Sequence, residues 1–131
     1  METNALYTLA TENGVTVDFF PMPQSRSACI SVDGRDYVAL DNSVKGSEER
    51  VCLAHELGHC LTSAFYSLYS PIALRDMAEK KAKQWTIKTL IPLKDLKSAI
   101  KNGICDLSLL ADHFGVTENL MEQAIGYYSC R

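Results

Sequence analysis

Residues 51–61, VCLAHELGHCL, decide the fold, because they hold the pattern HExxH on what reads as one helix. Residues four apart lie one helical turn above each other, so His55 and His59 can reach one metal ion. Glu56 lies beside them, close to the ion without binding it. In catalytic sites zinc binds imidazole nitrogen and keeps one position open for water, whose proton a nearby carboxylate can take. The pattern therefore predicts a Zn²⁺ site with His55 and His59 as metal ligands and Glu56 as the catalytic general base.

The rest of this helix also favours a metal site. Between positions 51 and 61, every residue outside the three motif positions is apolar, small or cysteine, which predicts a helix buried nearly all round. Burying two imidazoles and a carboxylate in such a helix costs folding free energy unless a metal or specific hydrogen-bond partners compensate for the lost hydration. The alternative is a pair of core histidines bonded to the backbone, with Glu56 in a buried ion pair.

A third protein ligand is expected on the following helix. Glu79 is a suitable carboxylate on a helix long enough to lie antiparallel to the first, and Asp76, one turn earlier, is its rival. Glu79 and Lys83 also form an i,i+4 pair that is typical of an exposed helix face. Spacing alone does not decide whether Glu79 or Asp76 is the third ligand.

Composition predicts one domain, residues 1–131. The chain is 47% hydrophobic and 22% charged, with a formal charge of −3, which argues against a nucleic-acid-binding protein. It has neither a secretory pattern at its start nor an apolar run long enough for a bilayer, so we expect a cytoplasmic protein without a membrane partner. The cysteines at 29, 52, 60, 105 and 130 form no CxxC pair and are expected to be reduced.

The hydrophobic pattern predicts an α+β fold: a small antiparallel three-stranded sheet packed on a helical bundle, with a zincin-like active-site helix. Asp33-Gly34 is a strong hairpin signal between the second and third strands. The expected strands are 15–20, 27–32 and 37–40, and the expected helices are 4–12, 47–65, 71–91, 92–102, 106–114 and 117–129.

Residues 79–92, EKKAKQWTIKTLIP, extend the HELGH motif to a longer pattern. The chain resembles the ImmA/IrrE metallopeptidases of bacteria and their mobile elements, which carry HELGH and then E-x-x-A-x-x-F-A-x-x-L-L-M-P. Glu79, Ala82 and Pro92 fall in register, and the substitutions, such as Trp85 for phenylalanine, are mild. The resemblance covers roughly residues 36–127.

This resemblance implies that Glu79 is the third zinc ligand, in a gluzincin-like HExxH…E site. It also implies a zinc metallo-endopeptidase whose protein substrate is a helix-turn-helix transcriptional repressor, so that the protein acts as an anti-repressor. No direct contact with nucleic acid is implied, and no oligomeric state is predicted.

Further residues are weaker candidates for the chemistry. Tyr66, Tyr69 and His113 are possible donors to the oxyanion of the tetrahedral intermediate. Strand 37–40 is predicted to be an edge strand that holds the substrate backbone by β-addition.

Two other classes of function compete with an enzyme. Residues 109–125, LLADHFGVTENLMEQAI, have the pattern of a DNA-binding helix-turn-helix, but Glu118 and Glu122 would oppose contact with phosphates. The chain could also be a zinc-binding anti-repressor that acts by interaction without turnover. Replacing Glu56 with glutamine separates that module from an enzyme, because only an enzyme loses its activity.

Overall fold

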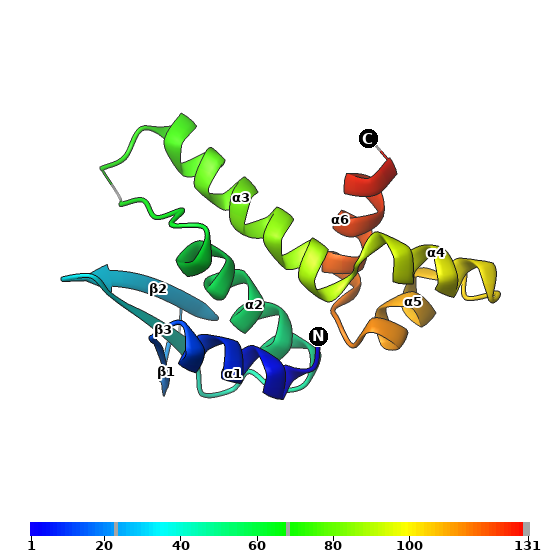
Figure 1. The fold of residues 1–131 in the computed structure, drawn as a ribbon, viewed down its shortest axis with the longest axis horizontal. Helices are drawn as coiled ribbons and strands as arrows, with labels where there is room; N and C mark the ends of the chain where they lie inside the picture. The colour runs from blue at the N-terminus through cyan, green and yellow to red at the C-terminus, as the bar shows by residue number, and fades with distance from the viewer. Residues whose placement is uncertain (23, 68, 130–131) are drawn as a thin grey trace.

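The computed structural model describes residues 1–22, 24–67 and 69–129, which form a three-stranded sheet and six helices (Figure 1). This is the predicted α+β class. In chain order the elements are α1 (Thr3–Glu12), β1 (Val15–Phe20), β2 (Ser27–Val32), β3 (Arg35–Asp41), α2 (Ser47–Leu61), α3 (Ile72–Leu90), α4 (Leu93–Lys101), α5 (Leu107–Phe114) and α6 (Glu118–Ser129).

The sheet is mixed, with strand order β1-β3-β2, so the prediction of a fully antiparallel sheet is wrong. The β2–β3 hairpin is antiparallel as expected, and Asp33 and Gly34 both have the positive φ of a type I′ turn. By contrast, β1 pairs with β3 in parallel. The chain after β1 passes over the end of β3, where the Asp41 carboxylate accepts a hydrogen bond from the Met22 N–H at 2.7 Å.

This strand order makes β3 the central strand. The prediction that residues 37–40 form an edge strand is therefore wrong, and β1 and β2 are the two edges. Val38 and Leu40 are 1% and 0% exposed, whereas Tyr37, which points to the opposite face, is 36% exposed. The core lies between the buried face of the sheet and the helices.

Helix α2 is the centre of the fold and packs against β2, β3 and α3. Leu53 and Leu57 of α2 are fully buried, as are Ile87 and Leu90 of α3. The α5–α6 pair adds further buried side chains, and Gly115 ends α5 in the left-handed conformation. Among the described residues, no helix has both the length and the apolar character needed to cross a membrane.

Helix α2 ends at Leu61, before the predicted residue 65. Ser63 takes a positive φ, and the Ala64 N–H donates back to the His59 carbonyl at 2.9 Å, which closes the helix. The chain that leaves this end leads directly to the candidate site.

Candidate metal site

The close approach of α2 and α3 positions the site. The two helices run side by side in opposite directions (Figure 1). A Cβ built on Gly58 would lie 2.8 Å from the Ala82 carbonyl oxygen, a distance that real Cβ atoms do not reach. Gly58 thus lets the backbone of α3 approach α2 closely. Glu79, one turn before Ala82, is therefore held over the two histidines of α2.

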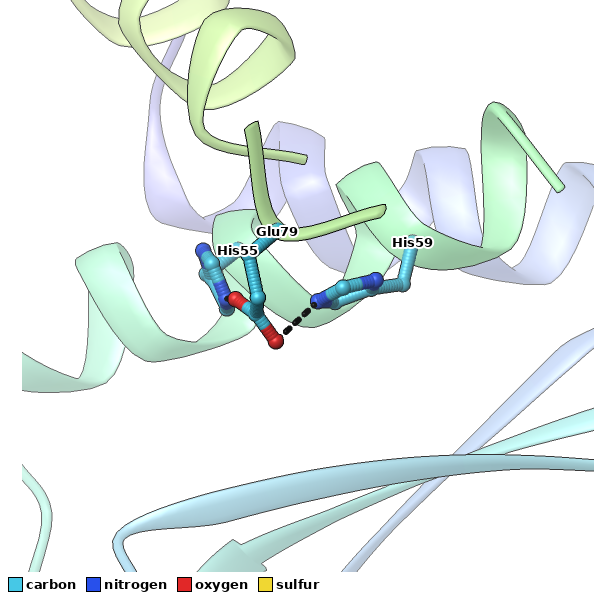
Figure 2. Close-up of side chains that lie close together, drawn as sticks. All are labelled: His55, His59 and Glu79. Atoms are coloured by element: carbon cyan, nitrogen blue, oxygen red, sulfur yellow. Dashed lines mark hydrogen bonds and ion pairs between the residues drawn. The ribbon is translucent and has the colours of Figure 1, made fainter. Parts of the chain in front are cut away.

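His55, His59 and Glu79 come together at this crossing (Figure 2). The Glu79 carboxylate lies 3.0 Å from His55 Nε2 through Oε2 and 3.2 Å from His59 Nε2 through Oε1. One ligand atom from each residue lies within 4.8 Å of the others. Tetrahedral zinc with bonds of about 2.0–2.2 Å requires ligand atoms roughly 3.3–3.6 Å apart. The two carboxylate distances are slightly shorter and the 4.8 Å limit is longer, so the donor set suits such an ion in chemistry and small side-chain shifts would adjust its spacing.

Asp76, the rival third ligand, is exposed and does not belong to this cluster. The two residues lie on the same helix, one turn apart, but only Glu79 faces α2. Of the two carboxylates between which spacing alone did not decide, the structure therefore places Glu79 with the histidines.

His59 is oriented by the end of its own helix. Its side chain is 4% exposed, and its Nδ1 lies 2.6 Å from the Ala64 carbonyl oxygen. A carbonyl accepts only, so Nδ1 carries a proton and donates, which makes Nε2, on the side of Glu79, the nitrogen that a metal can bind. The turn that ends α2 therefore fixes the tautomer that a metal requires.

Tyr66 supports Glu79 from the α2–α3 connection. Its hydroxyl donates to Glu79 Oε1 at 2.6 Å. Burial alone raises the pKa of Glu79, but the Tyr66 hydrogen bond and the neighbouring His55 and His59 outweigh it and lower that pKa below its usual value. The same hydrogen bond, with partial burial, raises the pKa of Tyr66 to about 12. Tyr66 is therefore a protonated donor at the site.

The other two weak candidates lie elsewhere. Tyr69 is 95% exposed. His113 is on α5, edge-on to the Phe114 ring, and lines a different cavity. Of the three predicted candidates, the structure brings only Tyr66 to the metal cluster.

Glu56 is buried beside the cluster, with 6% of its surface exposed. The Ser27 hydroxyl, from β2, donates to Glu56 Oε2 at 2.6 Å. Sequence reasoning missed Ser27, because the two residues are 29 apart and no local periodicity links a strand to a helix across that separation. The hydrogen bond fixes one oxygen of the Glu56 carboxylate, Oε2.

Cys29 of β2 lies next to Ser27 on the same face of the strand. Its thiol is hydrogen-bonded to Cys60 and Glu56, and these contacts together with burial raise the pKa of Cys29 far above its usual value. Cys29, Cys52, Cys60 and Cys105 are free thiols, as expected, and Cys130 lies outside the described residues.

Two cavities flank the cluster along β2. One, of about 250 Å³, is lined by Ser27, Cys29, Glu56, His59 and Tyr66 among others. The second, of about 220 Å³, lies on the His55 side and is also lined by Ser27. Residues of α6 and the turn before it complete the second cavity: Thr117, Asn119, Leu120 and Gln123. The start of the would-be DNA-recognition helix therefore faces the candidate site.

The free edge of β2 presents backbone groups to both cavities. The Asp41 N–H donates to the Arg26 carbonyl, so that pair is hydrogen-bonded and the ladder alternates from there. Ser27 and Cys29 fall on the alternate positions, whose N–H and C=O groups point away from β3. The Ser27 carbonyl already accepts from Ser25 Oγ at 2.8 Å, so the Ser27 N–H and both backbone groups of Cys29 are the ones that can pair with an extended peptide.

Comparison with known families supports the sequence resemblance. The profile of Peptidase_M78, described as the IrrE N-terminal-like domain, matches residues 10–125. A search among curated proteins found no significant match. The matched range includes α2 and α3, and with them every residue of the cluster.

Proposed function

The chain belongs to the ImmA/IrrE family of metallopeptidases, the family of the IrrE N-terminal-like domain. From this premise we propose that it is a zinc-dependent endopeptidase. The observation that carries the proposal is the convergence of His55, His59 and Glu79 within 4.8 Å, with the Glu56 carboxylate buried beside them.

We propose that His55 Nε2, His59 Nε2 and the Glu79 carboxylate hold the ion, with zinc preferred because two imidazoles and one carboxylate are a common catalytic zinc set. A bound zinc ion supplies a Lewis acid that activates water and polarises a carbonyl. The Ala64 carbonyl and the Tyr66 hydroxyl orient two of the ligands, as outer hydrogen-bond partners do in metal sites.

Glu56 is the proposed general base. With the ion bound, the Glu56 carboxylate would take the proton of the attacking water and pass it to the leaving amine, while Ser27 holds Oε2 in place. Burial of Glu56 behind β2 limits the access of bulk water to this carboxylate. Ser27 is therefore a positioning residue in this mechanism.

We propose that the substrate is a helix-turn-helix transcriptional repressor in the cytoplasm, which would make the protein an anti-repressor. The cleaved segment would bind extended along the free edge of β2, paired with Ser27 and Cys29 and with side chains in the two flanking cavities. This assigns to β2 the role that the sequence analysis gave to residues 37–40.

The test is Glu56→Gln in the full chain, measured by metal content and by cleavage of helix-turn-helix repressors from the same genome, beginning with any that a neighbouring gene encodes. We expect zinc content to equal that of the wild type and cleavage to fall by roughly 10²–10⁴-fold, as for loss of a general base. A zinc-loaded wild type that leaves the repressor intact, or a Glu56→Gln protein that cleaves normally, contradicts the proposal.

The same variant distinguishes an enzyme from an anti-repressor that acts without catalysis. An anti-repressor that acts by binding alone keeps its effect on the repressor after Glu56→Gln. A DNA-binding role is disfavoured because the start of α6 lines the cavity beside His55 and carries Glu118 in its first turn.

A further inference from the structure

Tyr66 borders the cavity that holds the proposed general base. This cavity of about 250 Å³ is lined by Tyr66 and by Ser27, Glu56 and Glu79, among others. Its walls therefore include the edge strand β2, the base and a proposed metal ligand. A substrate carbonyl that is attacked by water beside Glu56 must lie in this cavity, with the Tyr66 side chain as one of its neighbours.

Amide hydrolysis in this cavity requires stabilisation of a negative oxygen. When water adds to the carbonyl carbon, the C=O π electrons move to the oxygen, which stays an oxyanion until the pair returns and the C–N bond breaks. A hydrogen-bond donor already held beside that oxygen stabilises it without reorganisation at the moment of reaction. Such a donor gives only a hydrogen bond and keeps its proton.

The other side-chain donors on the cavity wall are already engaged. Among the described residues, Ser27, Cys29, His59 and Tyr66 line the cavity and can donate. The Ser27 hydroxyl and the Cys29 thiol are bonded to Glu56, and His59 Nδ1 donates to a backbone carbonyl. These contacts hold the base and a ligand in place, so the Tyr66 hydroxyl is the donor that remains for a substrate.

The Tyr66 hydroxyl is close to the metal cluster and able to turn. It donates to Glu79 Oε1 at 2.6 Å, and that oxygen lies 3.2 Å from His59 Nε2. The Tyr66 ring is edge-on to the His59 imidazole, with the two centroids 6.1 Å apart. Because Tyr66 is 42% exposed, its hydroxyl can move from Glu79 to an oxygen in the cavity without disturbing the core.

We propose that Tyr66 is a catalytic residue whose hydroxyl donates a hydrogen bond to the oxyanion of the tetrahedral intermediate. This inference rests on the proposed peptidase function. It gives the hydroxyl a second role beside the orienting contact with Glu79: the hydroxyl is held at the ligand before substrate binds and turns to the substrate oxygen as the negative charge develops.

The test is Tyr66→Phe, which removes only the hydroxyl, with Tyr69→Phe as the matched control, because Tyr69 belongs to the same connection and is 95% exposed. Both full-length proteins are measured at saturating zinc, with metal content verified, on the repressor that the wild type cleaves. We expect the kcat of Tyr66→Phe to fall by about 10²-fold at a KM close to that of the wild type, as for loss of one oxyanion donor. Tyr69→Phe should match the wild type.

Binding of a phosphinic peptide gives a readout that does not depend on turnover. The phosphinic group replaces the scissile amide by a tetrahedral anion, which accepts the hydrogen bond that the oxyanion would accept. In calorimetric titration Tyr66→Phe should bind this peptide about tenfold or more weakly than the wild type does. The same peptide with a methylene in place of the phosphinic group should bind both proteins equally.

A residue that only orients Glu79 predicts a different result. Tyr66→Phe would then bind zinc more weakly, and saturating zinc would restore both kcat and the affinity for the phosphinic peptide. That result, or a Tyr66→Phe protein that equals the wild type throughout, would overturn the proposal and leave the peptidase function intact. A zinc-loaded wild type that cleaves no repressor would contradict the peptidase function itself, and this inference with it.

Discussion

The Gly58→Ala variant tests the helix contact on which the metal site depends. The new methyl would lie 2.8 Å from the Ala82 carbonyl oxygen and 3.2 Å from Ala82 Cα. Both neighbours are backbone atoms, so no side-chain rotation relieves the contact. The axes of α2 and α3 must separate by about half an ångström to restore an ordinary contact.

The expected magnitude combines two opposing terms. Alanine improves helix propensity over glycine by about 1 kcal/mol, whereas overpacking of a core costs about 1–3 kcal/mol. Gly126→Ala, on α6, is the matched control, because a Cβ there meets nothing within 4 Å. Both variants share the propensity gain, so the difference between their free energies of unfolding isolates the packing cost.

Urea unfolding followed by circular dichroism measures this difference in metal-free protein. We expect Gly126→Ala to be more stable than the wild type, and Gly58→Ala to be less stable than Gly126→Ala by about 1–3 kcal/mol. Since separation of the helices moves Glu79 away from the histidines, zinc affinity should also fall by roughly tenfold or more in Gly58→Ala. Equal stability of the two variants, with zinc affinity unchanged in Gly58→Ala, would refute the reasoning.

Two further predictions concern Glu79 and the edge of β2. The lowered pKa of Glu79 in the metal-free protein stabilises the fold above the unfolded value of about 4.5, and this contribution is lost as pH falls through the lower folded value. Unfolding free energies should therefore decline less steeply with acid in Glu79→Gln, and identical slopes would contradict this. Cys29→Pro should slow cleavage at unchanged metal content, because it removes an N–H that points to the free edge, while Cys29→Ala keeps that N–H and should cleave faster than the proline variant. Equal rates in the two Cys29 variants would exclude β-addition at this position.

The candidate site was largely predictable because its decisive spacing is local. An i,i+4 histidine pair on a helix has one geometry, so His55 and His59 could be placed together from sequence alone. Glu79 lies on the next helix, and the family resemblance, rather than spacing, selected it over Asp76. The structure adds the physical reason, since Gly58 and Ala82 let α3 approach α2 at the level of Glu79.

The strand order was not predictable in the same way. Local turn chemistry at Asp33-Gly34 gave the β2–β3 hairpin correctly, but the partner of β1 depends on how the chain crosses the end of β3. A hydrogen bond between the Met22 N–H and the Asp41 carboxylate holds that crossing, and no hydrophobic periodicity of the sequence predicts such a contact. Consequently the edge strand beside the cluster is β2, and the Ser27 contact with Glu56 was not anticipated.

The central claim is that His55, His59 and Glu79 form one metal site, and elemental analysis of the purified protein tests it most directly. We expect about one zinc ion per chain in the wild type and little or none in Glu79→Ala, with both proteins folded by circular dichroism. A folded wild type that contains no metal and takes up no added zinc would contradict the account, and the HExxH helix would then carry a buried polar cluster.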